Sequence, residues 1–375
     1  MRGLGKRRGM HLDARSGGQK DDRGAISILV ALLLAAGVLT GLLGLVIDGG
    51  RMYAERRVVQ NGADAAALAV SQDCALKRTE CASQAAARAA AATFANSNAS
   101  DDGRTSIAEI CGSAPLNTCP SLGSSPSWSN CQTAVTGNYV RVRTQTESAK
   151  GDGYFLPIFA GVLSNGVGDR VSVGACSQVK WGPAASAGIK YPFLLPACTP
   201  LLDEGDKVIE DFDPNNPDTS CTVDGVTYNP VSKGFAFGSL PDQTKTCVGT
   251  QAISPTMTIS VETSLTQLCG KDISQTLDEV ISAGVPILLP VVGAHTQTGQ
   301  GQYEFTVIGF KSFTLRGYRL KNNTGGAAPA GGWNATVCGQ GAKRSCIHGS
   351  VGRGLVSGSA GGGSDFGVRA IQMIP

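Results

Sequence analysis

An uninterrupted apolar run near the N-terminus constrains this chain more than any other feature. Residues 25–47 read AISILVALLLAAGVLTGLLGLVI, without a charge, between Arg23 and Asp48. At 1.5 Å per residue, a helix of that length spans about 34 Å, more than the ~30 Å hydrocarbon core of a bilayer. A cleaved signal peptide is the main alternative, but its apolar region is about 7–15 residues long and precedes a small-residue cleavage site. The run therefore predicts a retained transmembrane helix over residues 25–47.

Charge and cysteine placement predict which side of the membrane each part occupies. The basic tail of residues 1–24 holds seven Lys and Arg residues against three Asp residues, and Lys and Arg favour the cytoplasmic side. All twelve cysteines follow residue 73, which suits an oxidising compartment where disulfides persist. We therefore expect a single-pass cell-membrane protein with a cytoplasmic N-terminus and an extracytoplasmic C-terminal domain. The disulfide candidates are Cys74, Cys81, Cys111, Cys119, Cys131, Cys176, Cys198, Cys221, Cys247, Cys269, Cys338 and Cys346.

The segment after the span, residues 48–95, has a helical pattern on the extracytoplasmic side. Small and medium apolar residues recur at spacings of seven, four, three and four, as on one face of an amphipathic helix. They are Met52, Val59, Ala63, Ala66 and Val70. A second, Ala-rich helix is expected over residues 78–95, with Thr79 as its N-cap.

Cys74 and Cys81 predict how the two helices are joined. On an unbroken helix they would lie about 10.5 Å apart along the axis, whereas a disulfide needs Cα atoms roughly 4.4–6.8 Å apart. Two free thiols outside the membrane would be unusual. The first helix is therefore expected to end near Lys77, and a Cys74–Cys81 bond is expected to close the turn.

The span and its continuation carry a recognisable pattern. After the span come Asp48-Gly-Gly-Arg-Met-Tyr53, then Gln60-Asn61, then Ala63-Asp-Ala-Ala-Ala-Leu-Ala69. Residues 22–72 thereby resemble the N-terminal segment of TadG-like proteins, which belong to the Tad (tight adherence, Flp pilus) assembly family. The resemblance implies a structural or assembly component of a Flp-type pilus system. Its implied partners are the membrane and other Tad/Flp pilus-assembly proteins, or a second copy, through the transmembrane and juxtamembrane helices.

The same resemblance bears on processing of the N-terminus. Pilins and pseudopilins of this machinery are cut after a Gly and usually carry Glu five residues into the mature segment. If Gly24 were that Gly, Leu29 would occupy the Glu position. A retained anchor is therefore expected.

Four small residues within the span are candidates for helix packing. They are Gly37, Thr40, Gly41 and Gly44. The G-x-x-x-G spacing lets two membrane helices approach closely, although Gly is common in membrane helices in any case. Both interpretations stay open.

Beyond residue 96 the composition changes to Gly, Ser, Thr, Asn and Pro, with short alternating runs typical of strands. We expect a loop over residues 96–130, a short packed helix over 154–163 and a disulfide-stapled, mainly β ectodomain over 96–350. Strands are expected at residues 139–146, 170–181, 285–292, 303–310 and 312–320. The Gly/Ser-rich tail, residues 351–375, is expected to be flexible. The predicted fold is α+β and membrane-anchored.

A search for enzymatic motifs returns little. The sequence has no C-x-x-C, no G-x-x-x-x-G-K-[ST] and no G-x-S-x-G string. The string nearest to the D-x-S-x-S metal motif of longer TadG-like proteins is Asp272-Ile-Ser-Gln-Thr276, which departs in its last place. His295 is more typical of a solvated loop than of a catalytic base. We therefore expect no catalytic residue, no cofactor and no metal site.

Two other classes of protein bear on this expectation, a nucleic-acid binder and a tethered enzyme or adhesin. A net charge of +3 excludes a nucleic-acid binder that depends on a clustered basic face. A membrane-tethered extracellular enzyme or adhesin that shares only the N-terminal segment remains the alternative to a pilus component.

Overall fold

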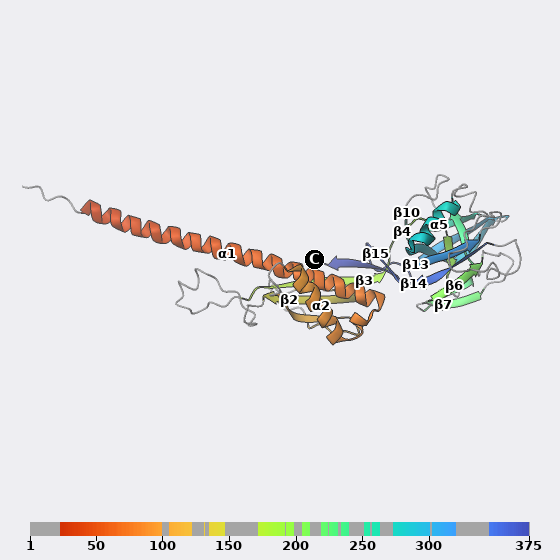
Figure 1. The fold of residues 1–375 in the computed structure, drawn as a ribbon, viewed down its shortest axis with the longest axis horizontal. Coiled ribbons are helices and arrows are strands. Elements are labelled where there is room, and N and C mark those ends of the chain that lie inside the picture. The colour runs from red at the N-terminus through yellow and green to blue at the C-terminus, as the bar shows by residue number, and fades with distance from the viewer. Residues whose placement is uncertain are drawn as a thin grey trace, which may run out of the picture. The chain divides into compact units, whose positions relative to one another are not determined.

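One helix, α1 (Arg23–Leu76), contains the apolar run and continues without interruption for 54 residues (Figure 1). It passes at Tyr53 from one compact unit of the chain into a second, which begins at Ala54. The computed structural model describes residues 23–99, 105–121, 131, 135–146, 172–191, 193–198, 205–210, 219–223, 225–231, 234–239, 251–255, 257–262, 273–300, 302–319 and 345–374. The predicted α+β class is confirmed: a long apolar helix precedes a mainly β part that contains disulfides.

The end of α1 is a Schellman turn. The Arg78 N–H donates to the Asp73 carbonyl at 2.8 Å, and the Lys77 N–H donates to the Cys74 carbonyl at 3.2 Å. Lys77 itself has a φ of 53°, the left-handed conformation that this motif requires. The predicted end near Lys77 and the predicted Cys74–Cys81 disulfide are both confirmed.

The second helix begins later than predicted. A 3-10 turn, η1 (Thr79–Cys81), precedes α2 (Gln84–Asn98). Ser83 is the N-cap, because its Oγ accepts the Ala86 N–H at 3.2 Å, while the Thr79 hydroxyl donates to Glu80 instead. The prediction of Thr79 as the cap was wrong because η1 displaces the start of the helix by several residues.

A five-stranded sheet packs against these helices, in the order β1-β2-β3-β16-β15 (Figure 1). Its strands are β1 (Thr105–Gly112), β2 (Asn138–Thr146), β3 (Gly174–Pro183), β15 (Gly354–Ser357) and β16 (Val368–Ile374). The strand predictions at 139–146 and 170–181 correspond to β2 and β3. The loop predicted over residues 96–130 was wrong in part, because β1 lies within it and pairs antiparallel with β2.

A second sheet has seven strands in the order β11-β9-β5-β12-β13-β14-β6. An added β11–β13 pairing closes β11, β9, β5, β12 and β13 into a ring. These strands are β5 (Phe193–Pro196), β6 (Gly205–Glu210), β9 (Ala236–Ser239), β11 (Thr258–Glu262), β12 (Ile287–Gly299), β13 (Gln302–Arg319) and β14 (Cys346–Gly352). The strands predicted at 303–310 and 312–320 are one continuous strand, β13.

Shorter elements complete the second unit. Two strand pairs join β4 (Ala187–Ile189) to β10 (Gln251–Ile253), and β7 (Thr219–Val223) to β8 (Val226–Val231). Helix α5 (Ile273–Ala283) packs Leu277 into a core cluster that includes Phe313 and Leu315 from β13. The Tyr318 hydroxyl donates to the Asp278 carboxylate at 3.0 Å, which fixes the helix to the same strand.

The C-terminal segment is ordered, which corrects the prediction of a flexible tail over residues 351–375. β15 and β16 join the sheet that packs on α1 and α2, and β16 pairs antiparallel with β3. In the Gly-rich stretch between them, Gly362 lies against Ala185, where a Cβ would clash with the Ala185 backbone. Glycine there serves close backbone approach rather than flexibility.

Several disulfides lie within the described part of the chain. Besides Cys74–Cys81, the bonds are Cys111–Cys119, Cys131–Cys176 and Cys198–Cys221. Cys346 is also disulfide-bonded. Cys247, Cys269 and Cys338 lie outside the described residues, as do the helix predicted over 154–163 and Asp272.

Candidate membrane anchor and its packing on the sheet

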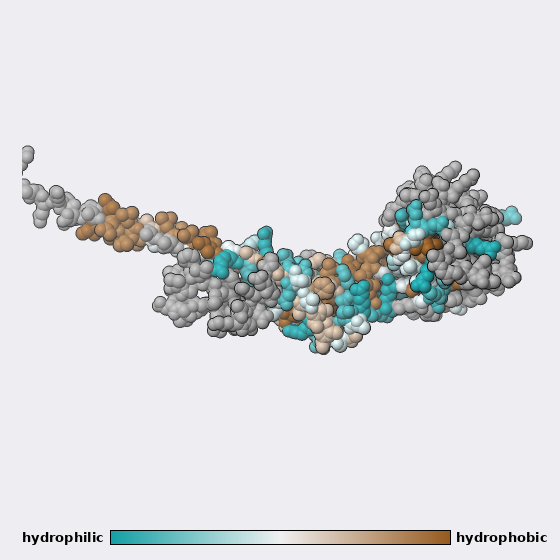
Figure 2. All heavy atoms as spheres, viewed as in Figure 1, coloured by the Kyte–Doolittle hydropathy of each residue, from teal (hydrophilic) through white to brown (hydrophobic). Residues whose placement is uncertain are grey.

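The first part of α1 exposes a continuous apolar surface. Leu33 is 66% exposed and Leu45 is 72% exposed, and most residues from Ile26 to Val46 are similarly exposed. Figure 2 shows this half of the helix as mostly brown, the colour of hydrophobic residues. In the described part of the chain, one helix is long and apolar enough to cross a membrane, with a mean hydropathy of 2.6 in its most apolar window. An exposed apolar surface of this extent is typical of contact with lipid or with another protein.

The candidate helix-packing residues lie within this exposed stretch. A Cβ added at Gly37 or Gly41 would meet nothing within 4 Å, so this face of α1 is open at both glycines. Gly44 is buried, and the side chain of Thr40 lies outside the described residues. Packing of a second helix on this face stays a prediction.

The second part of α1 is packed instead of exposed. Val59, Ala63, Ala66, Ala67 and Val70 are all fully buried. The last three belong to a core cluster with the strand residues Val140, Val142, Val179 and Trp181, and with Ala87 and Ala91 of α2. The predicted apolar stripe is therefore the face by which α1 packs on the five-stranded sheet and on α2. We call residues 54–76 of α1 the mount.

Gly62 allows α2 to lie close to the mount. A Cβ at this position would lie 3.2 Å from the Ala95 carbonyl oxygen and 3.1 Å from Thr105 Cγ2. Both contacts are tighter than ordinary van der Waals spacing. This glycine therefore serves helix packing, although glycine costs about 1 kcal/mol relative to Ala in a helix interior.

Hydrogen bonds also connect the mount to the sheet. The Thr144 hydroxyl of β2 donates to the Val59 carbonyl at 2.7 Å in a buried hydrogen bond. Gln60 donates from Nε2 to the Asp64 carboxylate at 2.8 Å and to the Cys176 carbonyl of β3 at 3.2 Å. Because buried hydrogen bonds demand specific geometry, these contacts fix the rotation of α1 about its own axis.

Two arginines from the C-terminal segment cap the end of α1. Arg353 Nη1 donates to the Leu76 carbonyl at 3.1 Å, and Arg369 Nη1 donates to the Ala75 carbonyl at 3.0 Å. The last carbonyls of a helix lack intrahelical partners and carry partial negative charge. Both cations therefore stabilise the helix end, a contact that the sequence analysis did not predict.

Two carboxylates near this helix end have shifted pKa values in opposite directions. Burial opposes ionisation of Asp365, but the hydrogen bonds and charge of Arg369, with the Gly367 N–H, outweigh it and lower the pKa of Asp365. For Asp73, burial raises the pKa, and the hydrogen bond and charge of Arg78 only partly offset it. The fold thus favours the charged form of Asp365 and the protonated form of Asp73.

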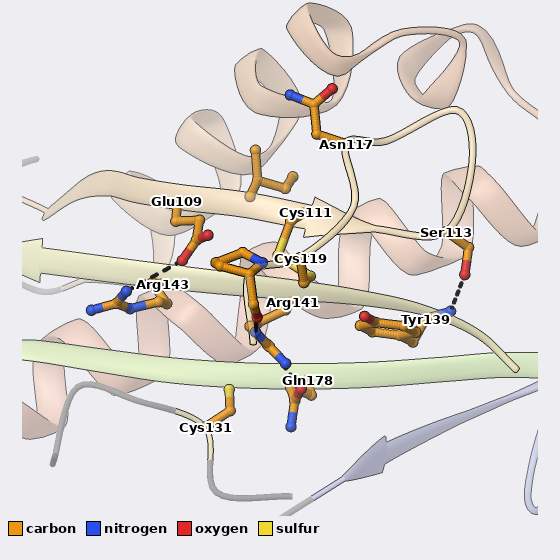
Figure 3. The surroundings of a disulfide bond; sticks show 12 residues. Glu109, Cys111, Ser113, Asn117, Cys119, Cys131, Tyr139, Arg141, Arg143 and Gln178 are labelled. Atoms are coloured by element: carbon orange, nitrogen blue, oxygen red, sulfur yellow. Dashed lines mark hydrogen bonds and ion pairs between the residues drawn. A yellow bond between two sulfur atoms is a disulfide. The ribbon is translucent and has the colours of Figure 1, made fainter. Parts of the chain in front are cut away.

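On β1, β2 and β3, the face of the sheet opposite the helices carries polar side chains and disulfides (Figure 3). The Cys111–Cys119 bond ties the loop after β1 back to that strand, and the Tyr139 N–H donates to the Ser113 hydroxyl at 3.0 Å. This loop is therefore held against the end of β2.

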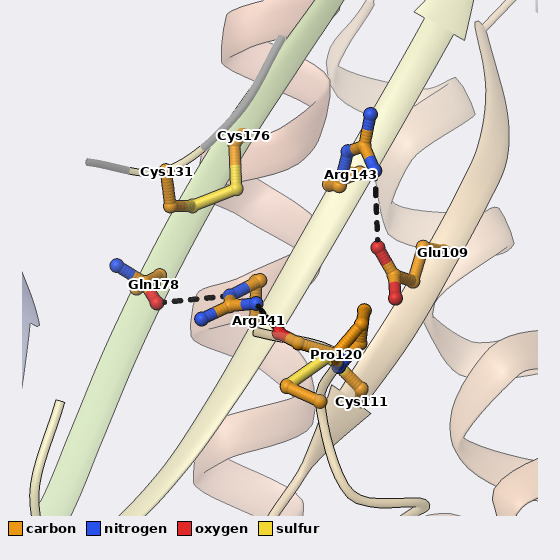
Figure 4. A network of polar contacts seen from close by, with 9 residues as sticks. Glu109, Cys111, Pro120, Cys131, Arg141, Arg143, Cys176 and Gln178 are labelled. Atoms are coloured by element: carbon orange, nitrogen blue, oxygen red, sulfur yellow. Dashed lines mark hydrogen bonds and ion pairs between the residues drawn. A yellow bond between two sulfur atoms is a disulfide. The ribbon is translucent and has the colours of Figure 1, made fainter. Parts of the chain in front are cut away.

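Arg141 is the central polar group on that face (Figure 4). Its Nε donates to Gln178 Oε1 at 3.0 Å, and its Nη1 donates to the Pro120 carbonyl at 3.0 Å. Arg143 forms an ion pair with Glu109 at 3.2 Å. Arg141 thus links β2, β3 and the loop after β1, which is a structural role.

Of the residues weighed for chemistry, Asp272 lies outside the described part of the chain. His295 lies in β12, where its ring centroid is 5.5 Å from those of Tyr303 and Phe305. Among the described residues, no group of three or more His, Cys, Asp or Glu side chains is placed to hold a metal ion.

The fold and site describe an α+β protein in which one candidate membrane-spanning helix is exposed along one half and packed on a sheet along the other. Residues 24–73 match the family described as "Putative Flp pilus-assembly TadE/G-like". The resemblance noted over residues 22–72 is confirmed by this match, which covers most of the N-terminal helix. No curated protein and no solved structure is significantly similar to the chain.

Proposed function

We propose that this chain is a single-pass membrane component of a Tad/Flp-type pilus system with a structural, non-enzymatic role. The observation that carries the proposal is the division of α1 within the matched segment, residues 24–73. The exposed half suits lipid, and the buried half is locked to a folded β unit. A helix shared in this way would connect a membrane anchor directly to the ectodomain.

The proposed orientation has a cytoplasmic N-terminus and an extracytoplasmic β part. The basic residues before Gly24 support it through the positive-inside rule. Disulfides among cysteines after residue 73 support it because such bonds persist in oxidising compartments. Protease added to intact spheroplasts tests this: it should remove a C-terminal tag and leave an N-terminal tag intact. The reverse pattern would contradict the orientation.

The proposed partners are other Tad/Flp assembly proteins, or a second copy, through α1. The open surface at Gly37 and Gly41 supports this part. Gly37→Ile or Gly41→Ile is expected to weaken association of the span by about 1 kcal/mol, because a bulky side chain separates the helix backbones. A membrane dimerisation assay of the span measures it, with Leu39→Ile as the matched control. Unchanged association in both Gly variants would leave these glycines without a packing role.

The function itself is tested by deletion in a host that assembles Tad/Flp pili. Loss of surface pili, restored by the wild-type chain, is the expected result. A second complementing chain, in which residues 25–47 are replaced by an unrelated transmembrane span, separates simple anchoring from specific contacts of this helix. Normal piliation in the deletion strain would contradict the proposal and favour a tethered enzyme or adhesin.

A further inference from the structure

The turn that joins α1 to α2 forms one wall of a cavity of about 410 Å³. Its lining includes three cationic side chains, Lys77, Arg78 and Arg369, together with Trp181, Pro115 and Asn138. No acidic side chain lines it. The volume lies at the small end of the range for ligand pockets, about 300–1,000 Å³.

The cationic groups at this cavity interact with carboxylates that lie outside it. Arg78 is paired with Asp73 at 3.2 Å, and Arg369 is paired with Asp365 and also donates to the Ala75 carbonyl. The charge of Lys77 acts on the Asp365 carboxylate, and Glu80 lies near Asp73 in the same turn. These carboxylates do not line the cavity, whereas the three cationic residues do.

The position of Lys77 is an independent observation. It occupies the C′ site of the Schellman turn with a φ of 53°, a conformation that is unfavourable for a non-glycine residue. Glycine is the usual residue there. A cationic side chain here interacts favourably with the helix end and with the Asp365 carboxylate, and it also lines the cavity.

The walls of the cavity are held rigid. The Cys74–Cys81 disulfide closes the turn, Arg353 and Arg369 cap the helix end, and Trp181 is almost fully buried in the core cluster. A rigid site loses little conformational entropy when a ligand binds.

We propose that this cavity binds a carboxylate that lies next to an apolar side chain in a peptide segment of a partner protein. Lys77 and Arg78 receive the carboxylate, and Trp181 with Pro115 receives the apolar group. The choice of a protein partner rests on the proposed function. The carboxylate belongs either to an acidic side chain or to a chain terminus, and both sources share this chemistry.

Binding is tested by calorimetry on the full chain in nanodiscs with three short peptides. Acetyl-Phe-Glu-amide carries a side-chain carboxylate, acetyl-Gly-Phe carries a terminal carboxylate, and acetyl-Phe-Gln-amide is the neutral control. At least one acidic peptide is expected to bind about tenfold more tightly than the neutral one, because charge-assisted hydrogen bonds are the stronger ones. Raising the salt concentration should reduce this preference.

Lys77→Gly is the decisive variant, because it removes the charge and relieves the backbone strain at the same time. It should unfold cooperatively at a denaturant concentration close to that of the wild type, yet lose the preference for acidic peptides. Lys207→Gln, on β6, changes net charge equally and should bind as the wild type does. Equal binding of acidic and neutral peptides, or full preference retained in Lys77→Gly, would overturn the proposal. Neither result depends on the piliation assay, so the two proposals fail separately.

Discussion

The two halves of α1 are continuous in backbone but adapted to different surroundings. Leucine and valine dominate the half between Ile26 and Val46, where their side chains are exposed. Alanine dominates the mount, where Ala63, Ala66 and Ala67 are fully buried. Lipid accepts any apolar side chain, whereas a sheet and a second helix accept only those that fit. Side-chain volume, rather than helix propensity, therefore distinguishes an anchor from a packed helix here.

Charges placed in the exposed half of α1 should have the largest effect, because they should prevent membrane association. Leu34 and Leu39 are 65% and 67% exposed, and an Arg near the centre of a membrane helix costs about 2.5–3.5 kcal/mol on insertion scales. The double variant Leu34→Arg/Leu39→Arg is expected to shift most of the protein out of the membrane fraction. Flotation of cell membranes on a density gradient measures this shift.

The matched change in the mount is Val70→Asp, which buries a charge in the core cluster. That variant should stay in the membrane fraction while its β unit becomes sensitive to protease. Identical behaviour of the two variants would mean that the halves of α1 do not differ in the way described.

Replacing a glycine in each half of α1 should change the stability of the β unit differently, with a smaller effect than the charged variants. Gly62→Leu would force its side chain against Ala95 and Thr105, and overpacking of this kind costs about 1–3 kcal/mol. Gly41→Leu, on the open face of the anchor, should leave the unfolding of the β unit unchanged. Denaturant unfolding in nanodiscs, followed by tryptophan fluorescence, gives both values. A wild-type midpoint for Gly62→Leu would show that α2 does not lie close to the mount.

Local patterns predict the N-terminal part of this fold well. The charge-free run and the seven-residue spacing of Cys74 and Cys81 depend only on neighbouring residues and on helix geometry. They were sufficient to predict a long apolar helix, its end near Lys77 and the disulfide that closes the turn.

Contacts between distant parts of the chain could not be predicted in the same way. Arg353 and Arg369 cap a helix that ends nearly 300 residues earlier, and no local pattern indicates such a contact. The Gly-rich stretch before β16 resembles a flexible linker in composition, but Gly362 and Gly363 lie close to other parts of the chain, and Gly358 and Gly361 have a positive φ. The strand Val368–Ile374 does not alternate clearly between buried and exposed residues. The sequence of this segment therefore gives no clear strand pattern.

The smallest predicted effect is a pH dependence of the helix end. Because the pKa of Asp365 is lowered by folding, its contribution to stability is present above its ordinary value of 3.8 and is lost as pH falls through the lower folded value. Asp365→Asn should therefore destabilise the β unit near neutral pH, by about 1 kcal/mol or less, and by less in acid.

Asp73 provides the opposite case at the same helix end. Its pKa is raised by folding, so its contribution is complete below 3.8 and is lost as pH rises through the folded value. The stability difference between wild type and Asp73→Asn should change with pH in the opposite sense to that of Asp365→Asn. The same sign for both variants in pH-dependent unfolding would contradict these assignments.

The division of α1 is measured most directly by the depth of spin labels along it. Labels at Leu34, Leu45, Tyr53 and Ala66 in the full chain, reconstituted in nanodiscs, would report collisions with oxygen and with a water-soluble nickel reagent. We expect high oxygen and low nickel accessibility at positions 34 and 45, nickel accessibility at 53 and protection from both reagents at 66. Nickel accessibility at positions 34 and 45 equal to that at 53 would contradict the assignment of this half of α1 as a membrane anchor.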